Sequence, residues 1–296
     1  MLKSSTLEEI KRGLQSVKAP KEAEYIVSLT SPGDDFIQET DTFDTWFSSA
    51  QWPYTTLMAG KEGDFERFYP TQVMETGYDI LPFWVMRMMM MGLYTTKKVP
   101  FENVYLHGLV RDEQGRKMAK SKGNVINPLG VIEKYGADAL RMALVMSTAA
   151  GKDSNTGETK IRGMRNLTNK IWNAARFLIM KQAEGVSTTK VDTVGFEKRL
   201  ADVVTEVTSH LDAFRIGLAA EAAYNHFWHW FCDEAIEQAK AGNIDTQTLL
   251  EGLETFLKLL HPFIPFVTEA IWQTLITEKL LDSPTPLILA PWPVYI

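Results

Sequence analysis

The segment with the clearest chemical potential is the loop KMAKSKGN, residues 117–124. It holds three lysines within six positions, together with a serine and a glycine. A lysine supplies a point charge for a transferring or leaving phosphate, and a glycine lets the backbone approach a ligand closely. The pattern predicts a loop that folds over phosphates, with Lys117, Lys120 and Ser121 as the candidate contacts. An ordinary exposed basic loop is the competing interpretation.

A P-loop is excluded as the source of phosphate binding. Gly151-Lys152 lacks the glycine required five residues upstream, where Met146 stands, and Asp153 occupies the position of the required serine or threonine. Phosphate chemistry would therefore depend on the lysine loop.

The second candidate is the turn TGYD, residues 76–79, between an expected strand over 71–76 and an expected helix over 80–94. In an open α/β sheet, ligands bind at the carboxyl ends of the strands. Gly77 and Asp79 could thus approach a nucleotide, and His107-Gly108, at the end of the next expected strand, would lie at the same edge. A tight turn, a helix cap and a structural histidine are the alternatives.

Two other clusters favour structure over chemistry. His226, His229 and Cys232 recur every three residues, but a zinc site normally needs a fourth ligand and none is near in sequence. We therefore predict no metal site there, and a buried aromatic helix instead. The methionines at 86 and 88–91 are expected to fill gaps in a core, on a helix enclosed within its domain.

The elements that must position these residues fall into two classes. Strands over 71–76 and 104–110 alternate with helices over 80–94 and 137–147, and Asn127-Pro128 is a good helix start, so the first part predicts a parallel α/β sheet. After Gly151 the strands are expected to stop, with a linker over 151–157. Helical periodicity then covers 159–182, 194–211, 213–240, 246–260 and 265–281, which predicts an all-helical bundle. Lesser expectations are a short helix over 7–17, a turn over 31–34, a loop over 185–190 and an extended end over 287–296.

Composition places the chain among globular proteins. It has 296 residues, of which 45% are hydrophobic, and its single cysteine excludes a disulfide framework. The longest apolar stretch, 80–94, contains Arg87 and is too short to span a membrane, and the first residues lack an apolar signal region. The expected compartment is the cytoplasm.

Charge is unevenly distributed along the chain. The net charge is −6, yet residues 97–176 hold 15 Lys and Arg against 7 Asp and Glu. A basic middle within an acidic chain fits a polyanionic partner, and a chance excess on a solvated face is the alternative. Within this region, candidate nucleic-acid contacts recur along one expected helix: Lys160, Arg162, Arg165, Lys170 and Arg176. Trp172 of the same helix is expected in the core.

Six segments carry a resemblance to a known family. They are DTWFSSAQWP (44–53), ETGYDILPFWVMRMMMMGLY (75–94), VYLHGLVRDEQGRKMAKSKGNVINP (104–128), YGADALR (135–141), RNLTNKIWNAARF (165–177) and LLHPFIPFVTEAIW (259–272). Together they resemble valyl-tRNA synthetase from about residue 41 to residue 292. DTWFSS and HGLVRDE favour the valyl over the isoleucyl and leucyl relatives, which carry other residues there.

The resemblance implies a class I aminoacyl-tRNA synthetase. Its Rossmann domain would activate valine with ATP and Mg²⁺, and a helical domain would bind tRNA(Val). Lys117 and Lys120 would stabilise the pyrophosphate side of the adenylation transition state, and the TGYD turn would lie near the adenosine. The resemblance also places the valine side chain against three residues: Trp46, Ile80 and Trp84.

Three departures accompany the resemblance. Ala119 replaces the usual serine of the family's KMSKS loop, Pro82 stands where an aromatic residue is common, and the family's HIGH motif and editing insertion are absent from these 296 residues. The expected division is a remnant of the editing insertion in 1–40, the C-terminal half of a Rossmann catalytic domain in 41–153, and a helical anticodon-binding domain in 154–296.

The expected function is therefore part of a valine–tRNA ligase, inactive alone. The HIGH half would be supplied elsewhere, for instance by a separate partner chain. The alternatives are a tRNA-binding polypeptide without catalysis and an isoleucyl- or leucyl-type synthetase.

Overall fold

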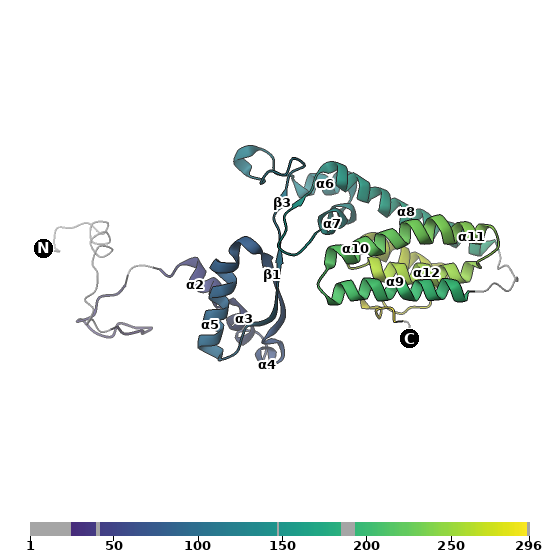
Figure 1. Ribbon diagram of the computed structural model, residues 1–296. Coiled ribbons are helices and arrows are strands. Elements are labelled where there is room, and N and C mark those ends of the chain that lie inside the picture. The colour runs from purple at the N-terminus through teal and green to yellow at the C-terminus, as the bar shows by residue number, and fades with distance from the viewer. Residues whose placement is uncertain (1–24, 40–41, 147, 185–192, 295–296) are drawn as a thin grey trace. The chain divides into compact units, whose positions relative to one another are not determined.

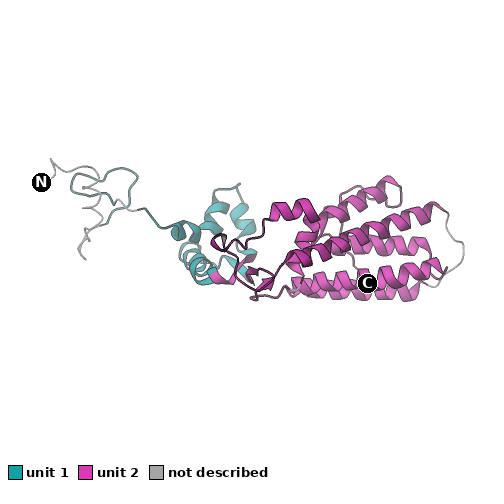
Figure 2. Ribbon diagram, turned by 90° about the horizontal axis from the view of Figure 1, so that it is seen from above, with its two compact units in different colours: residues 1–72, 80–102 teal, residues 73–79, 103–296 magenta. Residues whose placement is uncertain are grey.

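The computed structural model describes residues 25–39, 42–146, 148–184 and 193–294 (Figure 1). They form two compact units, residues 1–72 with 80–102 and residues 73–79 with 103–296 (Figure 2). The helix expected over 7–17 and the loop expected over 185–190 lie outside the described residues. A turn occurs at Asp34 and Asp35, where the Phe36 N–H donates to the Gly33 carbonyl at 3.4 Å, close to the expected position.

The first unit packs short helices onto a longer one. Helices α2 (Thr45–Ala50), α3 (Trp52–Met58) and α4 (Asp64–Phe68) precede α5 (Met86–Thr96). Asp44 caps α2, because its side chain accepts the Trp46 N–H at 3.3 Å. Both α2 and α3 pack on α5, where Met88 is fully buried.

The helix expected over 80–94 is not continuous. The chain forms a 3₁₀ turn at Tyr78–Ile80, a π-helical turn at Leu81–Val85 and then α5. The expectation that its methionines are enclosed is wrong for three of them: Met86, Met89 and Met90 are 47%, 40% and 61% exposed. Consecutive apolar residues on a helix point in every direction, and here only one face packs on α2 and α3.

The strands form two small sheets. Strand β1 (Thr71–Gly77) pairs with β2 (Phe101–His107), and β3 (Val110–Arg111) pairs in parallel with β4 (Ser154–Asn155). The expected strand over 104–110 is thus interrupted at Gly108. The expectation that strands stop after Gly151 is wrong, since β4 lies in the stretch that was predicted to be a linker.

Helices α6 (Pro128–Tyr135) and α7 (Ala137–Val145) follow the lysine loop. The predicted start is confirmed, because the Asn127 side chain accepts the Leu129 N–H at 3.1 Å and Pro128 occupies the first helical position. Gly136, with φ of 91°, separates the two helices.

The second half of the chain is a helical bundle, as predicted. It contains α8 (Glu158–Ala183), α9 (Val194–Asp212), α10 (Ile216–Asn225), a π-helical segment (His226–Ala235), α11 (Ile236–Lys240), α12 (Thr246–Leu260) and α13 (Pro265–Thr277). The segment expected as one helix over 213–240 begins only at Ile216, and the C-terminal piece includes a 3₁₀ turn at Leu287–Leu289. Among the described residues, no helix is long and apolar enough to cross a membrane.

Aromatic side chains fill the centre of the bundle. The rings of Phe227, Phe231 and Phe256 lie 5.3–5.6 Å apart and are fully buried, which confirms the predicted aromatic helix. Cys232 is buried beside them, and burial raises the pKa of its thiol to about 12. His226 Nε2 instead lies 2.9 Å from Glu206 Oε2, in an ion pair when the imidazole is protonated. The described residues contain no group of three His, Cys, Asp or Glu side chains placed to hold a metal ion.

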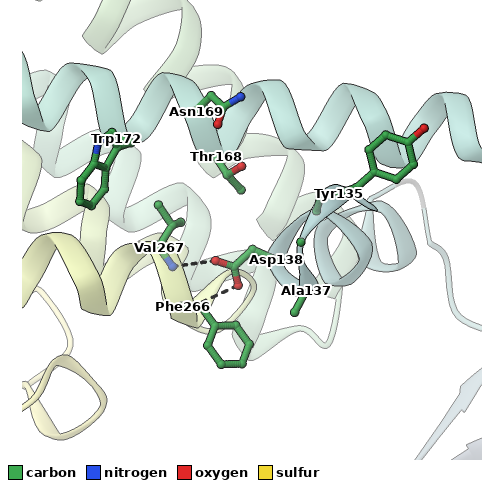
Figure 3. Close-up of a pocket in the computed structure, with 10 residues that line it drawn as sticks. Tyr135, Ala137, Asp138, Thr168, Asn169, Trp172, Phe266 and Val267 are labelled. Atoms are coloured by element: carbon green, nitrogen blue, oxygen red, sulfur yellow. Dashed lines mark hydrogen bonds between the residues drawn. The ribbon is translucent and has the colours of Figure 1, made fainter. Parts of the chain in front are cut away.

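Helix α7 is fastened to the start of α13 by polar contacts (Figure 3). Asp138 accepts the N–H groups of Phe266 at 3.2 Å and Val267 at 2.7 Å. Arg141 donates from Nε to the Phe263 carbonyl and from Nη2 to the Pro262 carbonyl, both at 3.0 Å. Burial raises the pKa of Asp138 and outweighs the opposing effect of the two N–H donors.

The first prediction concerns this fastening. Asp138→Ala should lower the free energy of unfolding by about 1–3 kcal/mol, the usual cost of leaving buried donors unpaired. Urea unfolding followed by tryptophan fluorescence measures it. Asn173→Ala, an exposed change on α8, is the control and should stay within about 0.5 kcal/mol of the parent chain. Equal midpoints for the two variants would contradict the prediction.

Candidate functional site

Four predicted nucleotide-binding residues meet where β1 and β2 end. Gly77 is buried, and a Cβ placed on it would lie 2.8 Å from Asp79 Oδ1 and 3.5 Å from His107 Cε1. His107 Nδ1 lies 2.8 Å from the Gly108 carbonyl oxygen, and its Nε2 lies 3.3 Å from Glu75 Oε1. The glycine turn, the acid and the histidine therefore form one cluster at the carboxyl ends of the strands.

A cleft of about 590 Å³ opens beside His107 and Gly108. Glu75, Tyr105 and Lys152 also line it, among apolar side chains. This volume is within the range of small-molecule sites, and an imidazole, a carboxylate and an ammonium on apolar walls can orient a polar ligand.

Gly108 is required by a close approach between two backbone segments. A Cβ on Gly108 would lie only 1.8 Å from the Lys152 carbonyl oxygen. The Ser154 N–H donates to the Leu109 carbonyl at 3.1 Å, so the chain of residues 151–154 runs alongside the end of β2. Any side chain at position 108 would push these segments apart.

Asp153 holds this arrangement together, and sequence reasoning missed it. Its Oδ1 accepts the Leu109 N–H at 2.8 Å, and its Oδ2 accepts Arg111 Nε at 2.5 Å. The phenol of Tyr78 also donates to it. The Leu109 N–H and then the Arg111 hydrogen bond lower the pKa of Asp153, whereas the hydrogen bond to Asp153 raises the pKa of Tyr78. Only the pairing of β3 with β4 brings these residues together, and no local pattern predicts that pairing.

The lysine loop extends from the end of β3. Lys117 and Ser121 are exposed, and the backbone of Lys120–Lys122 forms a 3₁₀ turn. Gly123 has φ of 64°, in the left-handed region that favours glycine, and it turns the chain back toward β3. The loop thus presents the charges of Lys117 and Lys122 to solvent while its two ends lie close together.

Two side chains at the base of this loop were also missed. Asp112 follows β3, and its side chain is 9% exposed. It accepts hydrogen bonds from Asn124 and Arg116, with Asn124 the larger influence, and they lower the pKa of Asp112 to about 2. Asn124 could have been suspected from its place at the end of the lysine loop, but the sequence does not show what it would contact.

The three predicted valine-pocket residues all belong to the first unit. Trp46 and Trp84 are half-buried: the Trp46 ring lies 6.2 Å from that of Phe83, and Trp84 Nε1 donates to the Ser49 carbonyl at 3.3 Å. Both tryptophans therefore join α2 to the π-helical turn. Ile80 ends the preceding 3₁₀ turn and Trp84 lies in the π-helical turn, so the two do not share a face of one α-helix, although a single helix was expected over 80–94.

The five predicted nucleic-acid contacts all lie on α8, but they differ in what they contact. Lys160 Nζ donates to the Met146 carbonyl at 2.6 Å, and burial lowers its pKa. Lys170 pairs with Asp233 at 2.6 Å. The remaining three are exposed and lie within about 60° of one another around the helix: Arg162, Arg165 and Arg176. Of these, Arg165 also donates from one guanidinium nitrogen, Nη1, to the Lys134 carbonyl at 3.0 Å.

Trp172 lies on this exposed face and not in the core, contrary to expectation. It is 44% exposed, and Asn169 precedes it by one helical turn (Figure 3). Both line a cavity of about 360 Å³ that Asp138 and Phe266 border from α7 and α13. Aromatic, amide and guanidinium groups on one helix face form a surface that can contact a polyanion with exposed bases.

Two family models match the chain. The first, described as tRNA synthetases class I (I, L, M and V), matches residues 3–157, more than half of the sequence. The chain belongs to the class I tRNA synthetases. The second model, described as the anticodon-binding domain of tRNA ligase, matches residues 195–296 of this synthetase chain.

Curated relatives of the synthetase chain are named valine–tRNA ligase. The Dehalococcoides mccartyi protein is 44% identical over 292 residues, which is 91% of this chain and 33% of the relative. The Geobacter sulfurreducens protein is 47% identical over 261 residues, covering 82% and 29%. The Enterococcus faecalis protein is 43% identical over 293 residues, covering 92% and 32%. The chain thus spans about a third of the length of the curated relatives it matches.

Solved synthetase structures share the fold. The Agrobacterium radiobacter LeuRS, in a ternary complex with tRNA and LeuAMS, has a TM-score of 0.73 at 20% identity, covering 86% of this chain and 33% of that one. The Mycobacterium tuberculosis methionyl-tRNA synthetase with methionyl-adenylate has a TM-score of 0.60 at 21% identity, covering 80% and 53%. These likenesses confirm the predicted fold class, a fragment of a Rossmann-like parallel sheet followed by a helical bundle.

The second prediction follows from the Asp153 hydrogen bonds. Asp153→Asn should lower the pKa of Tyr78 toward its ordinary value, because it removes the negative charge that the phenol faces. NMR titration of ring-labelled tyrosine measures this shift. Glu75→Gln is the control: burial and, to a smaller extent, the charge of Glu75 raise the pKa of Tyr105, and this change should leave Tyr78 unaffected. An unchanged Tyr78 titration in Asp153→Asn would show that the hydrogen bond is absent in solution.

Proposed function

We propose that the chain is part of a valine–tRNA ligase, which activates valine with ATP and transfers it to tRNA(Val). The observation that carries this proposal is the identity of 44% over 91% of the chain with a curated valine–tRNA ligase. Residues 41–153 would form the C-terminal half of the catalytic domain and residues 154–296 the anticodon-binding domain. Residues 1–40 would be what remains of the editing insertion.

Activation joins valine to AMP. A valine carboxylate oxygen attacks the α-phosphorus of ATP, and the bond to the bridging oxygen breaks as pyrophosphate leaves. Lys117 and Lys120 would stabilise the charge that develops on the pyrophosphate, a contribution made only late in the reaction. Mg²⁺ would arrive with the ATP phosphates, and it would neutralise part of their charge.

The cluster at the end of β1 and β2 would bind the nucleotide. Gly77 allows close approach of the adenosine, Asp79 can accept hydrogen bonds from ribose hydroxyls, and His107 and Gly108 border the adjoining cleft. Ser121 of the lysine loop would donate to a phosphate. The glycines, the acid and the histidine of this cluster converge where β1 and β2 end, and this convergence supports the assignment.

Trp46, Ile80 and Trp84 would enclose the valine side chain. Rigid aromatic walls suit a small branched group and exclude a longer one by overlap. An apolar pocket discriminates against threonine by only about a hundred-fold, because threonine is nearly isosteric with valine. Accurate charging would therefore require an editing activity elsewhere in the enzyme.

The test is a chimera in which the 296 residues replace the matching segment of the Dehalococcoides mccartyi relative. Valine-dependent ATP–pyrophosphate exchange should be robust in the chimera and absent from the 296-residue polypeptide alone. Isoleucine and leucine are tested in parallel. Preference for either would favour an isoleucyl- or leucyl-type enzyme, and tRNA binding without exchange in the chimera would favour the non-catalytic alternative.

The third prediction concerns the lysine loop. In the chimera, Lys117→Ala or Lys120→Ala should slow exchange roughly ten- to a thousand-fold, the range for one lost transition-state contact. The KM for valine should change little. Ala119→Ser adds no charge and is the control. If it changed the rate as much as the lysine substitutions, the charge argument would be wrong.

The fourth prediction concerns tRNA binding by α8. We infer that its exposed arginines contact the tRNA backbone. Lys160 and Lys170 would contribute less, because their ammonium groups already bind the Met146 carbonyl and the Asp233 carboxylate. Reversing Arg162, Arg165 and Arg176 to Glu should weaken tRNA(Val) binding and reduce the log–log salt slope by about one per lost phosphate contact.

Filter binding over a salt series measures this effect on the 296-residue chain. The control reverses three exposed lysines elsewhere in the bundle to Glu, with the same change in net charge: Lys198, Lys240 and Lys279. Equal losses in the two triple variants would indicate a general charge effect, and the assignment to α8 would fail.

A further inference from the structure

The two ends of the lysine loop are joined by one side chain. Asn124 Oδ1 accepts the Ala119 N–H at 3.0 Å, and its Nδ2 donates to the Lys117 carbonyl at 3.3 Å. The same Nδ2 donates to Asp112 Oδ2 at 3.0 Å. A single amide group therefore contacts the backbone on both sides of Met118 and fastens it to the end of β3.

These three contacts specify an amide at position 124. The nitrogen faces two acceptors, a carboxylate and a carbonyl, while the oxygen faces a donor. An aspartate would place a second negative charge against Asp112. An apolar side chain would remove the partner that the Ala119 N–H and the Lys117 carbonyl find in Asn124, and it would take one donor away from Asp112.

Asp112 is a firm anchor for that amide. Its Oδ1 accepts the N–H groups of Gln114 at 3.1 Å and Arg116 at 2.8 Å, and its Oδ2 accepts Arg116 Nε at 2.8 Å. With Asn124 it has four donors, and those from Asn124 and then Arg116 lower its pKa to about 2. The carboxylate therefore stays charged at any pH at which the enzyme would work, and it is positioned by β3.

We propose that Asn124 is a positioning residue that, held by Asp112, fixes the backbone of Lys117 and Ala119 and so determines where the loop presents its lysines. The 3₁₀ turn of Lys120–Lys122 begins directly after Ala119, so its backbone inherits the same constraint. The catalytic consequence rests on the proposed function. The fastening of the loop does not.

The fifth prediction tests the fastening on the 296-residue chain. Trypsin cleaves after lysine and arginine, so native-state digestion reports how often the loop opens. Asn124→Ala should raise the cleavage rate within 117–122 roughly ten-fold, the scale for losing hydrogen bonds that include one to a charged group. Asn124→Asp should raise it further. Adding Asp112→Asn to Asn124→Asp should slow cleavage again, because an amide then faces a carboxylate once more.

Asn127→Ala is the matched control. It removes an asparagine three residues away whose side chain caps α6 by accepting the Leu129 N–H. Cleavage within 117–122 should match the parent chain in this variant. Equal rates in Asn124→Ala and Asn127→Ala would overturn the proposal, whatever the chimera shows.

The chimera tests the consequence for the reaction. Asn124→Ala should lower kcat for exchange with little change in the KM for valine. In a Lys117→Ala background the same substitution should have a much smaller effect, because the group it positions is gone. Equal effects in both backgrounds would show that Asn124 does not act through Lys117. If the loop opens in the chain but Lys117→Ala leaves exchange intact, the proposed role of the lysines fails and the fastening stands.

Discussion

The arrangement of the strands and turns in the α/β part depends on the contacts of one carboxylate, that of Asp153. It neutralises Arg111 of β3, caps the Leu109 N–H where β2 has ended, and accepts the phenol of Tyr78 from the turn after β1. Three segments remote in sequence thereby meet at one charged group. Arg111 and Asp112 are neighbours, so the same short strand serves both the nucleotide-binding cluster and the lysine loop. Within this unit, Arg111 and Asp112 therefore connect the two candidate sites. Arg111 contacts Asp153 beside the nucleotide-binding cluster, and Asp112 contacts Asn124 at the base of the lysine loop.

The basic excess of the middle region has more than one use. Lys160 and Lys170 direct their ammonium groups to a backbone carbonyl and to Asp233, and Arg141 holds the turn before α13. These cations stabilise the fold. Arg162 and Arg176 remain exposed, and they share a helix face with Trp172. Net charge along a sequence therefore overstates the charge that a partner would meet.

Much of the fold was predictable because it depends on local pattern. The boundaries of α8, α9 and α12 follow from the period of buried residues, and the start of α6 follows from its cap and proline. Strand β4 was not predictable, since its two residues gain their conformation from β3 and carry no signal of their own. Nor were the π-helical turns, which change the register of a helix without changing its composition.

The same division applies to the candidate site. Lysines in a loop and glycines after strands are visible in the sequence, and Gly77, Asp79 and His107 do converge. The residues that hold such groups in place are ordinary acids and amides. Asp153, Asp112 and Asn124 could be recognised only from what they contact. Trp172 was misassigned because helical periodicity identifies a face, and its position lies beside the buried stripe without belonging to it.

Helix α8 also sets a length. Its 26 residues rise about 39 Å along one axis, from Glu158, whose side chain pairs with Lys134 of α6, to the far end of the bundle. Arg162 and Arg176 are rigidly separated by about 21 Å on that axis. Inserting one residue between them would turn the distal half by about 100° and disperse the exposed face around the helix. The spacing of residues along α8, as much as their identity, therefore limits which insertions and deletions the exposed face can tolerate.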